Sequence, residues 1–279
     1  MRCAGRCSAR VFPFRLASWL PTSYASSLHW LKSLLVRLGR DCALRVWEDA
    51  CRNYDEKLLR QILQAKWHDA EPEEAVTAEK TIAALGPQFF PAAIEGVSEK
   101  NATQLVGQQP LLSRIRQTFP SPHVWREMTA YEAIHLKLEM AALLAESLLR
   151  FHGKQGELIA YEILRAERSR TTEETTGSAA AFMHNFRLAL TEGLFAAGLE
   201  LEIVRVTEQE LVLHVTECAW ARYFQEQHPQ VGYLTACSTD ETAFRASHNN
   251  LRMQRTSTLM EGGKVCDFRI YQQTDHCRD

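Results

Sequence analysis

The sequence lacks a surplus of positive charge, a long hydrophobic run and an internal repeat. Its formal net charge is -2, with 24% charged and 46% hydrophobic residues in 279. Proteins that bind phosphate backbones need a surplus of Lys and Arg, so we expect no nucleic acid as a partner. No stretch approaches the roughly 18 consecutive apolar residues of a membrane-spanning helix, so we expect no membrane partner either.

Closely spaced cysteine pairs are also missing. The eight cysteines contain no CxxC pair and stand at positions 3, 7, 42, 51, 218, 237, 266 and 277. This spacing fits neither a disulfide scaffold nor a zinc ribbon. Reduced thiols in the cytoplasm fit best, and we expect a cytoplasmic protein.

Acidic residues are absent from the first 40 positions, although this stretch is rich in arginine; the first acid is Asp41. Such a composition is typical of an organelle transit peptide, of a disordered extension or of a start assigned too far upstream. We therefore set residues 1–27 apart as a leader.

Three further segments follow. Residues 28–68 form an N-terminal helical segment, in which a leucine stripe beginning at Leu28 ends at Gly39 and Asp41 caps a second helix. These helices are too short to be stable alone, so they pack on the next segment or on a second subunit, and a homo-oligomer stays open. Residues 69–128 mix acidic, Gly/Pro and short apolar pieces and form a connecting region.

Residues 129–273 carry the main domain. Helices are expected over 129–151, 155–169 and 178–197, then a β-hairpin from LELEIVRVT and ELVLHVTE, a helix from CAWARYFQEQ and another over 231–243. A second hairpin pairs LRMQRTSTL with VCDFRIYQQ through Glu261-Gly262-Gly263. The sequence predicts an α+β fold with helices packed on a roughly four-stranded antiparallel sheet.

Arg255 stands out in the last hairpin. Strand alternation places it on the same face as Leu251 and Met253, while Cys266 shares a face of the next strand with Ile270. A guanidinium on the apolar side of a strand is costly unless a carboxylate meets it. That carboxylate is either an internal acid, such as Asp240 or Asp267, or belongs to a substrate.

Three cysteines of the C-terminal half fall at predicted junctions between elements: Cys218, Cys237 and Cys266. With Asp240 nearby, they could form a nucleophile with its activators or a metal site, since both need a stabilised thiolate. Each could also be a small buried hydrophobe. Separations of 19 and 29 residues disfavour zinc, and His214 alternates onto the exposed face of its strand.

The order of these residues resembles the L-2-amino-thiazoline-4-carboxylic acid hydrolase family. Cys218, an aromatic helix, Gly232, Cys237 and Asp240 are followed by RTSTLMEGGKVCDFR, which matches the family's typical ending RTxTLxxGxxxCDFR. GELIAYEILRAER also looks like the family's helical part. The resemblance covers about residues 130–272.

The resemblance implies ring-opening hydrolysis of a small cyclic amidine carrying a carboxylate, towards a carbamoyl-cysteine type product. Arg255, with Cys218, would bind the substrate, and Asp240 would hold the exocyclic amidine nitrogen. Cys237 or Cys266 would attack as a thiolate, whose pKa Arg255 would lower. Otherwise the three cysteines would hold a divalent metal that activates water. Thr256 and Thr258 would be structural.

A rival interpretation comes from the likeness of the C-terminal half to 4-vinyl reductase-like ligand-binding domains. Such a domain would be a non-catalytic sensor for a small molecule or a metal. Fold analogy supports a pocket without fixing a reaction. An enzyme needs Arg255 together with a reactive thiol, whereas a sensor should tolerate Cys266→Ser.

Overall fold

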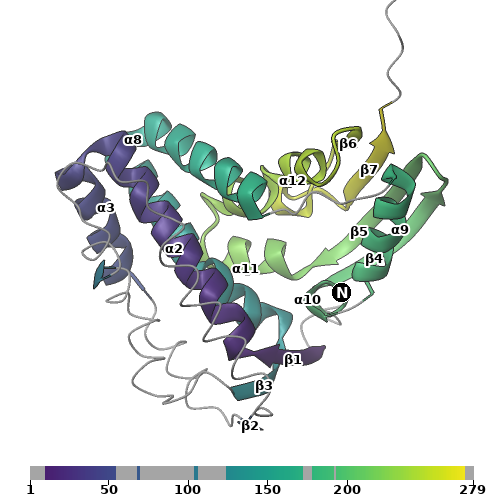
Figure 1. Ribbon diagram of the computed structural model, residues 1–279, viewed down its shortest axis with the longest axis horizontal. Helices are drawn as coiled ribbons and strands as arrows, with labels where there is room; N and C mark the ends of the chain where they lie inside the picture. The colour runs from purple at the N-terminus through teal and green to yellow at the C-terminus, as the bar shows by residue number, and fades with distance from the viewer. Residues whose placement is uncertain are drawn as a thin grey trace, which may run out of the picture. The chain divides into compact units, whose positions relative to one another are not determined.

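A computed structural model describes residues 10–54, 68–69, 104–105, 124–171, 178–191 and 193–273 (Figure 1). The chain divides into two compact units, one with residues 1–12, 129–134 and 164–279 and the other with 13–128 and 135–163. The expected segments do not coincide with these units, because residues 135–163 group with the N-terminal helices. The segment boundaries stay a prediction, and most of the expected connecting region lies outside the described residues.

The N-terminal helices belong to the second unit. Helix α2 (Leu16–Leu38) buries Leu28, Leu31 and Leu35, which confirms the leucine stripe, and Gly39 separates it from α3 (Arg40–Arg52) with a φ of 71°. The N-cap is Gly39, and Asp41 lies in the first turn of α3, so its predicted capping role is wrong. Because α2 begins at Leu16, the expected end of the leader at residue 27 falls inside a helix.

Helix α8 (Ala130–Thr171) contains both helices expected between 129 and 169. Its backbone breaks at Gly153, where φ is 53°, a conformation that favours glycine. In the second unit, Asp49 of α3 accepts hydrogen bonds from Ser147 (2.6 Å) and Arg150 (2.9 Å) of α8.

A small sheet that the sequence analysis missed has the order β1-β3-β2. It is formed by β1 (Val11–Arg15), β3 (Val124–Thr129) and β2 (His68–Asp69), and β2 pairs antiparallel with β3. With two residues, β2 is too short to show a hydrophobic alternation.

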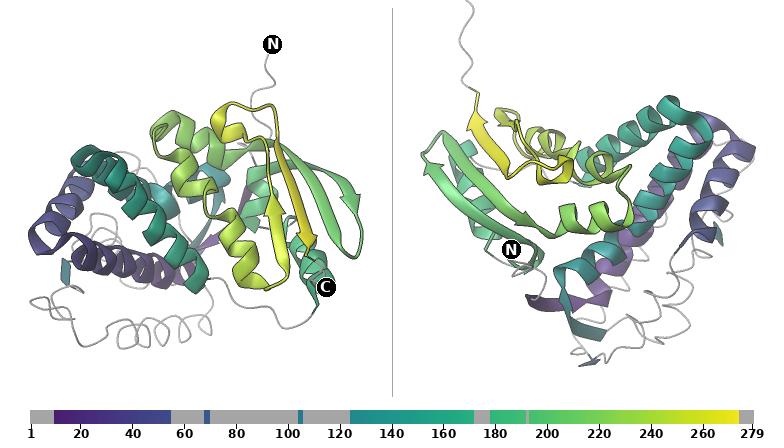
Figure 2. Two further views of the ribbon diagram at one scale, coloured as in Figure 1. Left: turned by 90° about the horizontal axis from the view of Figure 1, so that it is seen from above. Right: turned by 180° about the vertical axis from the view of Figure 1, so that it is seen from behind.

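The first unit contains the expected four-stranded antiparallel sheet, in the order β4-β5-β7-β6 (Figure 2). Its strands are β4 (Leu199–Val206), β5 (Glu210–Cys218), β7 (Cys266–Gln272) and β6 (Leu251–Gln254). The protein is therefore α+β, as predicted.

One face of this sheet builds the core of the first unit. Alternation buries Leu211, Leu213 and Val215 of β5, and they pack with residues of α9 (Ala179–Ala189) and α12 (Asp240–Ser247). On β7, Cys266 is buried in the same cluster. His214, out of phase, is only half-buried, in line with its predicted position off the core face.

Two predicted helices are shorter than expected. The helix over 178–197 ends at Ala189, because the amide and hydroxyl of Thr191 both bond to the carbonyl of Leu188. Helix α10 (Gly193–Gly198) follows. The helix over 231–243 is replaced by a π-helical turn, η1 (Tyr233–Cys237), and by α12.

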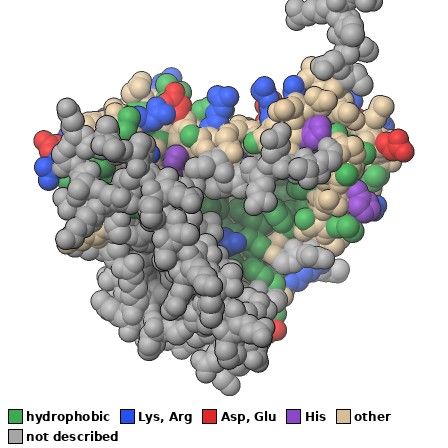
Figure 3. Space-filling view, viewed as in Figure 1, with side chains coloured by type: hydrophobic (Ala, Val, Ile, Leu, Met, Phe, Trp, Pro, Cys, Tyr) green, Lys and Arg blue, Asp and Glu red, His purple; other side chains and the backbone are tan. Residues whose placement is uncertain are grey.

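The described helices include none that is long and apolar enough to cross a membrane. On the face drawn in Figure 3, the basic and acidic side chains of the described residues are interspersed.

Candidate functional site

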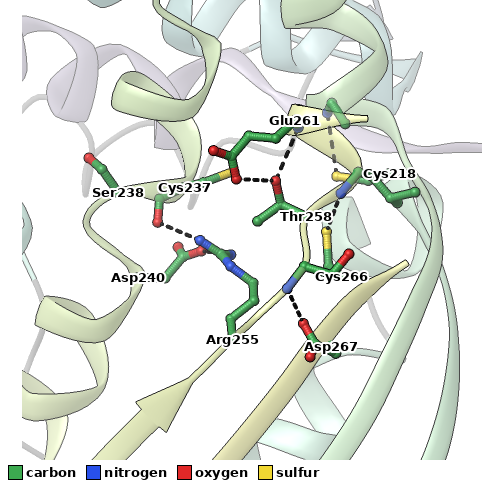
Figure 4. A network of polar contacts seen from close by, with 12 residues as sticks. Cys218, Cys237, Ser238, Asp240, Arg255, Thr258, Glu261, Cys266 and Asp267 are labelled. Carbon is green, nitrogen blue, oxygen red and sulfur yellow. Dashed lines mark hydrogen bonds and ion pairs between the residues drawn. The ribbon is translucent and has the colours of Figure 1, made fainter. Parts of the chain in front are cut away.

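Five predicted site residues come together in the first unit, where three junctions of the chain meet (Figure 4). Cys218 ends β5 before α11 (Ala219–Gln227), Cys237 ends η1, and Asp240 begins α12. Arg255 follows β6, and Cys266 begins β7. Their charges lie close enough to influence one another's pKa values.

An ion pair between Arg255 and Asp240 forms the centre of this group. Nη1 of Arg255 donates to Oδ2 of Asp240 at 2.7 Å, and Nη2 donates to the carbonyl of Cys237 at 3.0 Å. Only 6% of the Arg255 side chain and 19% of the Asp240 side chain are exposed. One of the two internal acids predicted for Arg255 is thus its partner, whereas a role towards a substrate stays a prediction.

This contact also explains why the predicted helix over 231–243 is interrupted. In a continuous α-helix the carbonyl of Cys237 would accept from the amide of residue 241. Arg255 occupies that carbonyl instead, and the amide of Ser238 bonds to Tyr233 five residues earlier. The first and last residues of this turn, Tyr233 and Cys237, both lie beside the guanidinium of Arg255. The guanidinium carbon is 5.9 Å from the centre of the Tyr233 ring.

Asp240 has a second cationic neighbour that sequence reasoning missed. Nη2 of Arg168, near the end of α8, lies 3.7 Å from Oδ1 of Asp240, and 47% of the Arg168 side chain is exposed. Burial raises the pKa of Asp240, and the charges of Arg255 and Arg168 oppose that shift. Burial would lower the pKa of Arg255, but the charges of Asp240 and Cys237, together with hydrogen bonds to Asp240 and Tyr233, outweigh this effect and raise it.

The three cysteines have different surroundings. Sγ of Cys218 accepts from the amide of Ala221 at 3.4 Å and so caps α11. Sγ of Cys266 accepts from the amide of Leu259 at 3.1 Å, and Cys266 is part of the apolar core, against which Cys218 packs. Cys237 is half-buried and is not among the members of that core.

The sequence analysis expected a thiolate at Cys237 or Cys266, but the pKa values of these thiols are raised. Burial raises the pKa of Cys218 to about 12 and also raises the pKa of Cys237 and of Cys266. Arg255 does act to lower the pKa of Cys237 and Cys266, as predicted, but burial outweighs it. In the free protein the three sulfurs are therefore neutral thiols.

The three cysteines were also considered as ligands of a divalent metal, and their arrangement can be compared with that role. Within the described part of the chain, no group of three His, Cys, Asp or Glu side chains is arranged to hold a metal ion. Cys218, Cys237 and Cys266 thus do not form a ligand set in this conformation.

Polar contacts within the loop between β6 and β7 set the position of Arg255. Asp267 accepts from the amides of Thr256 (2.9 Å) and Ser257 (2.6 Å) and from the hydroxyl of Thr256 (2.5 Å). Burial opposes these bonds, but they hold the pKa of Asp267 below its usual range. The predicted strand LRMQRTSTL ends at Gln254 because this carboxylate takes the amides that a strand would pair.

The next turn of the loop is a 3₁₀ helix, η2 (Leu259–Glu261), capped by Thr258. The Thr258 hydroxyl accepts from the amide of Glu261 (3.1 Å) and donates to its carboxylate (2.9 Å). The first bond is that of a capping box, whereas the second joins the carboxylate to the hydroxyl of Thr258 instead of to its amide; the spacing Thr-x-x-Glu could have indicated the cap. The contacts of Thr256 and Thr258 agree with the structural role predicted for both.

Gly232 of the predicted motif lies where helix α11 meets η2. A Cβ atom at this position would stand 2.8 Å from both Cβ of Phe224 and Sδ of Met260. The chain therefore needs a glycine here for close packing, at the point where it enters η1.

Comparison with known protein families gives a match to the C-terminal half of the chain. Residues 126–270 match the family model of L-2-amino-thiazoline-4-carboxylic acid hydrolase, which is about half of the 279-residue chain. The match contains every site residue described above. No curated protein and no solved structure matches the chain. The chain belongs to the L-2-amino-thiazoline-4-carboxylic acid hydrolase family.

Proposed function

We propose that the protein is a hydrolase that opens the ring of a small cyclic amidine bearing a carboxylate. The substrate would be L-2-amino-thiazoline-4-carboxylate or a related compound, and the product a carbamoyl-cysteine type compound. The observation that carries this proposal is the meeting of Asp240 with a half-buried thiol, Cys237, and two arginines.

Asp240 would bind the amidine. A carboxylate offers about four lone-pair positions, so Asp240 can accept from amidine N–H groups while it stays paired with Arg255. Arg255 then acts by holding Asp240 and the carbonyl of Cys237 in place. This binding would orient the electrophilic amidine carbon towards the thiols.

Cys237 is the best-placed nucleophile among the three cysteines. Cys266 belongs to the apolar core, and Cys218 caps a helix and packs on that core, so their sulfurs have structural roles. Cys237 is half-buried, and its pKa responds to both Asp240 and Arg255. Because burial keeps it protonated, it must lose its proton to the substrate.

The proposed reaction has two stages. The proton of Cys237 passes to an amidine nitrogen, the sulfur bonds to the amidine carbon, and the ring C–S bond breaks as the substrate sulfur takes up a proton. Water then attacks the same carbon, the bond to Cys237 breaks, and the thiol regains its proton. The net change is addition of one water; a substrate with nitrogen at the ring position of the sulfur would lose a C–N bond instead.

The alternative is a non-catalytic ligand-binding module, and the raised pKa values of all three thiols favour it. A neutral buried thiol is inert without a base. Such a module would keep its ligand affinity in Cys237→Ser.

The test is to incubate the full chain with L-2-amino-thiazoline-4-carboxylate and to follow carbamoyl-cysteine by mass spectrometry, with and without a chelator. We expect chelator-resistant turnover, an adduct of one substrate mass on Cys237 after rapid quenching, and no turnover in Cys237→Ser. Cys42→Ser, in α3, is the matched control and should be active.

Two outcomes would reject parts of the proposal. Turnover that the chelator abolishes would replace the thiol mechanism by a metal-dependent one. Absence of turnover in folded protein, with added divalent metals, would reject the hydrolase and favour the binding module.

A further inference from the structure

The carboxylate of the proposed substrate needs a cationic partner, and Arg255 is poorly suited to it. Both terminal nitrogens of Arg255 donate within the protein, to Asp240 and to the carbonyl of Cys237. Its guanidinium carbon lies 5.0 Å from the ring centre of Phe268 and 5.9 Å from that of Tyr233. With 6% of its side chain exposed, it has little access to a ligand, and turning away would leave Asp240 buried without its closest partner.

Arg168 meets the requirements that Arg255 does not. It approaches the other oxygen of Asp240, at 3.7 Å, which is an ionic contact longer than a hydrogen bond. About half of its side chain is exposed, at 47%. Its guanidinium is therefore accessible to a ligand from solvent, and Arg255 would continue to neutralise Asp240.

The connectivity of the substrate class points to the same residue. In an amino-thiazoline carboxylate, the carbon that bears the carboxylate is bonded to the ring nitrogen of the amidine. A cation that binds this carboxylate must stand beside the group that binds the amidine. Arg168 stands beside Oδ1 of Asp240, whereas Arg255 donates to Oδ2.

We propose that Arg168 binds the carboxylate of the substrate and selects for cyclic amidines derived from an α-amino acid. This inference rests on the proposed function. It assigns amidine recognition to Asp240 and acid recognition to Arg168, and it leaves Arg255 as a positioning residue.

The test compares two substrates, the thiazoline carboxylate and its uncharged carboxamide, in the full chain and in Arg168→Gln, Arg168→Lys and Arg165→Gln. Arg165 is exposed on the same helix one turn earlier, so Arg165→Gln controls for a lost surface charge. Arg168→Gln should raise KM for the acid about 10- to 100-fold, the range of one hydrogen bond to a charged group, with kcat little changed. Turnover of the carboxamide should hardly change.

The conservative variant checks the geometry. Lysine keeps the charge but loses the planar fork that fits a carboxylate, so Arg168→Lys should recover only part of the preference for the acid. Arg165→Gln should resemble the parent chain.

The outcomes separate this inference from the proposed function. If the parent chain turns over the acid and Arg168→Gln keeps the same preference over the carboxamide, the inference fails and the hydrolase stands. An equal loss on both substrates also overturns it, since Arg168 would then act through Asp240. If the parent chain turns over neither compound, the proposed function is rejected and the inference with it.

Discussion

At the scale of single residues, Arg255 shows how an internal pairing can look like a ligand site in a sequence. Its position among apolar residues indicated a partner carboxylate, and Asp240 was one of the internal acids expected. The pairing itself could be anticipated because an unpaired buried guanidinium is costly. The deep burial of Arg255, whose side chain is only 6% exposed, could not be anticipated. It depends on Phe268 and on a π-helical turn that no local sequence pattern predicts.

Replacing Asp240 tests the pair directly. Asp240→Asn should abolish turnover and lower the free energy of unfolding by about 3 kcal/mol, as expected when a buried ion pair loses one member. Urea denaturation monitored by circular dichroism measures this, with the exposed neighbour Glu241→Gln as the control. A loss as small as that of the control would mean that Arg255 finds another partner.

The thiols give a prediction about pH. Because burial raises the pKa of Cys218, Cys237 and Cys266, each should react with iodoacetamide more slowly than free cysteine at pH 8. Labelling should accelerate as the pH rises well above 9, and peptide mass spectrometry assigns it to each residue. Rapid labelling of Cys237 below pH 8 would contradict the neutral-thiol assignment.

The same shifts make stability depend on pH. A thiol with a raised pKa stays protonated in the folded state, while the unfolded thiol titrates near its ordinary value of about 8.5. The stabilisation is therefore complete below that value and declines as the pH rises towards about 12, the pKa of Cys218. Cys218→Ala should flatten the fall of the free energy of unfolding between pH 8.5 and 10, by at most about 1.4 kcal/mol per pH unit. If the free energy of unfolding falls equally steeply with pH in the parent chain and in Cys218→Ala, the raised pKa of Cys218 does not contribute to the pH dependence of stability.

At the scale of elements, strands were more predictable than helix ends. The alternation in β5 and β7 was visible in the sequence because one face of each strand packs on a core. The ends of β6 and η1 could not be predicted from the sequence. They are set by Asp267 and Arg255, which lie outside these two elements. Local patterns do not contain such contacts.

The cap on η2 can be tested with paired substitutions. Thr258→Ala removes the hydroxyl that bonds to Glu261 and should cost about 1 kcal/mol, typical of a lost N-cap. Thr258→Ser keeps the hydroxyl and should cost less, by thermal unfolding. If serine destabilises as much as alanine, packing of the methyl group, rather than capping, explains the buried threonine.

At the scale of the whole molecule, α8 explains why the two compact units do not follow the segments expected from the sequence, whose boundaries stay a prediction. Its middle, within residues 135–163, groups with the N-terminal helices, while its ends group with the sheet. The family match from 126 to 270 therefore spans parts of both units. Arg168 was missed for a related reason, because nothing in a helical stretch tells which distant residue it will meet.

The N-terminal boundary gives a test at this scale. Deleting residues 1–27 removes β1 and residues 16–27 of α2, whereas deleting residues 1–9 leaves every described element intact. The longer deletion should lower Tm by several degrees, or about 5 °C for a loss near 2 kcal/mol, by differential scanning calorimetry. Equal Tm values for the two deletions would support the leader boundary expected from composition.

The loop between β6 and β7 is held by its own Thr258–Glu261 pair and by Asp267 at the start of β7, which bonds to Thr256 and Ser257. A loop and adjoining strand that satisfy each other's polar groups can be inherited unchanged while the residues around them diverge. The motif RTxTLxxGxxxCDFR would then mark a shared scaffold, and the choice of substrate would evolve at positions outside it. Arg168, some 90 residues earlier in the chain, is such a position.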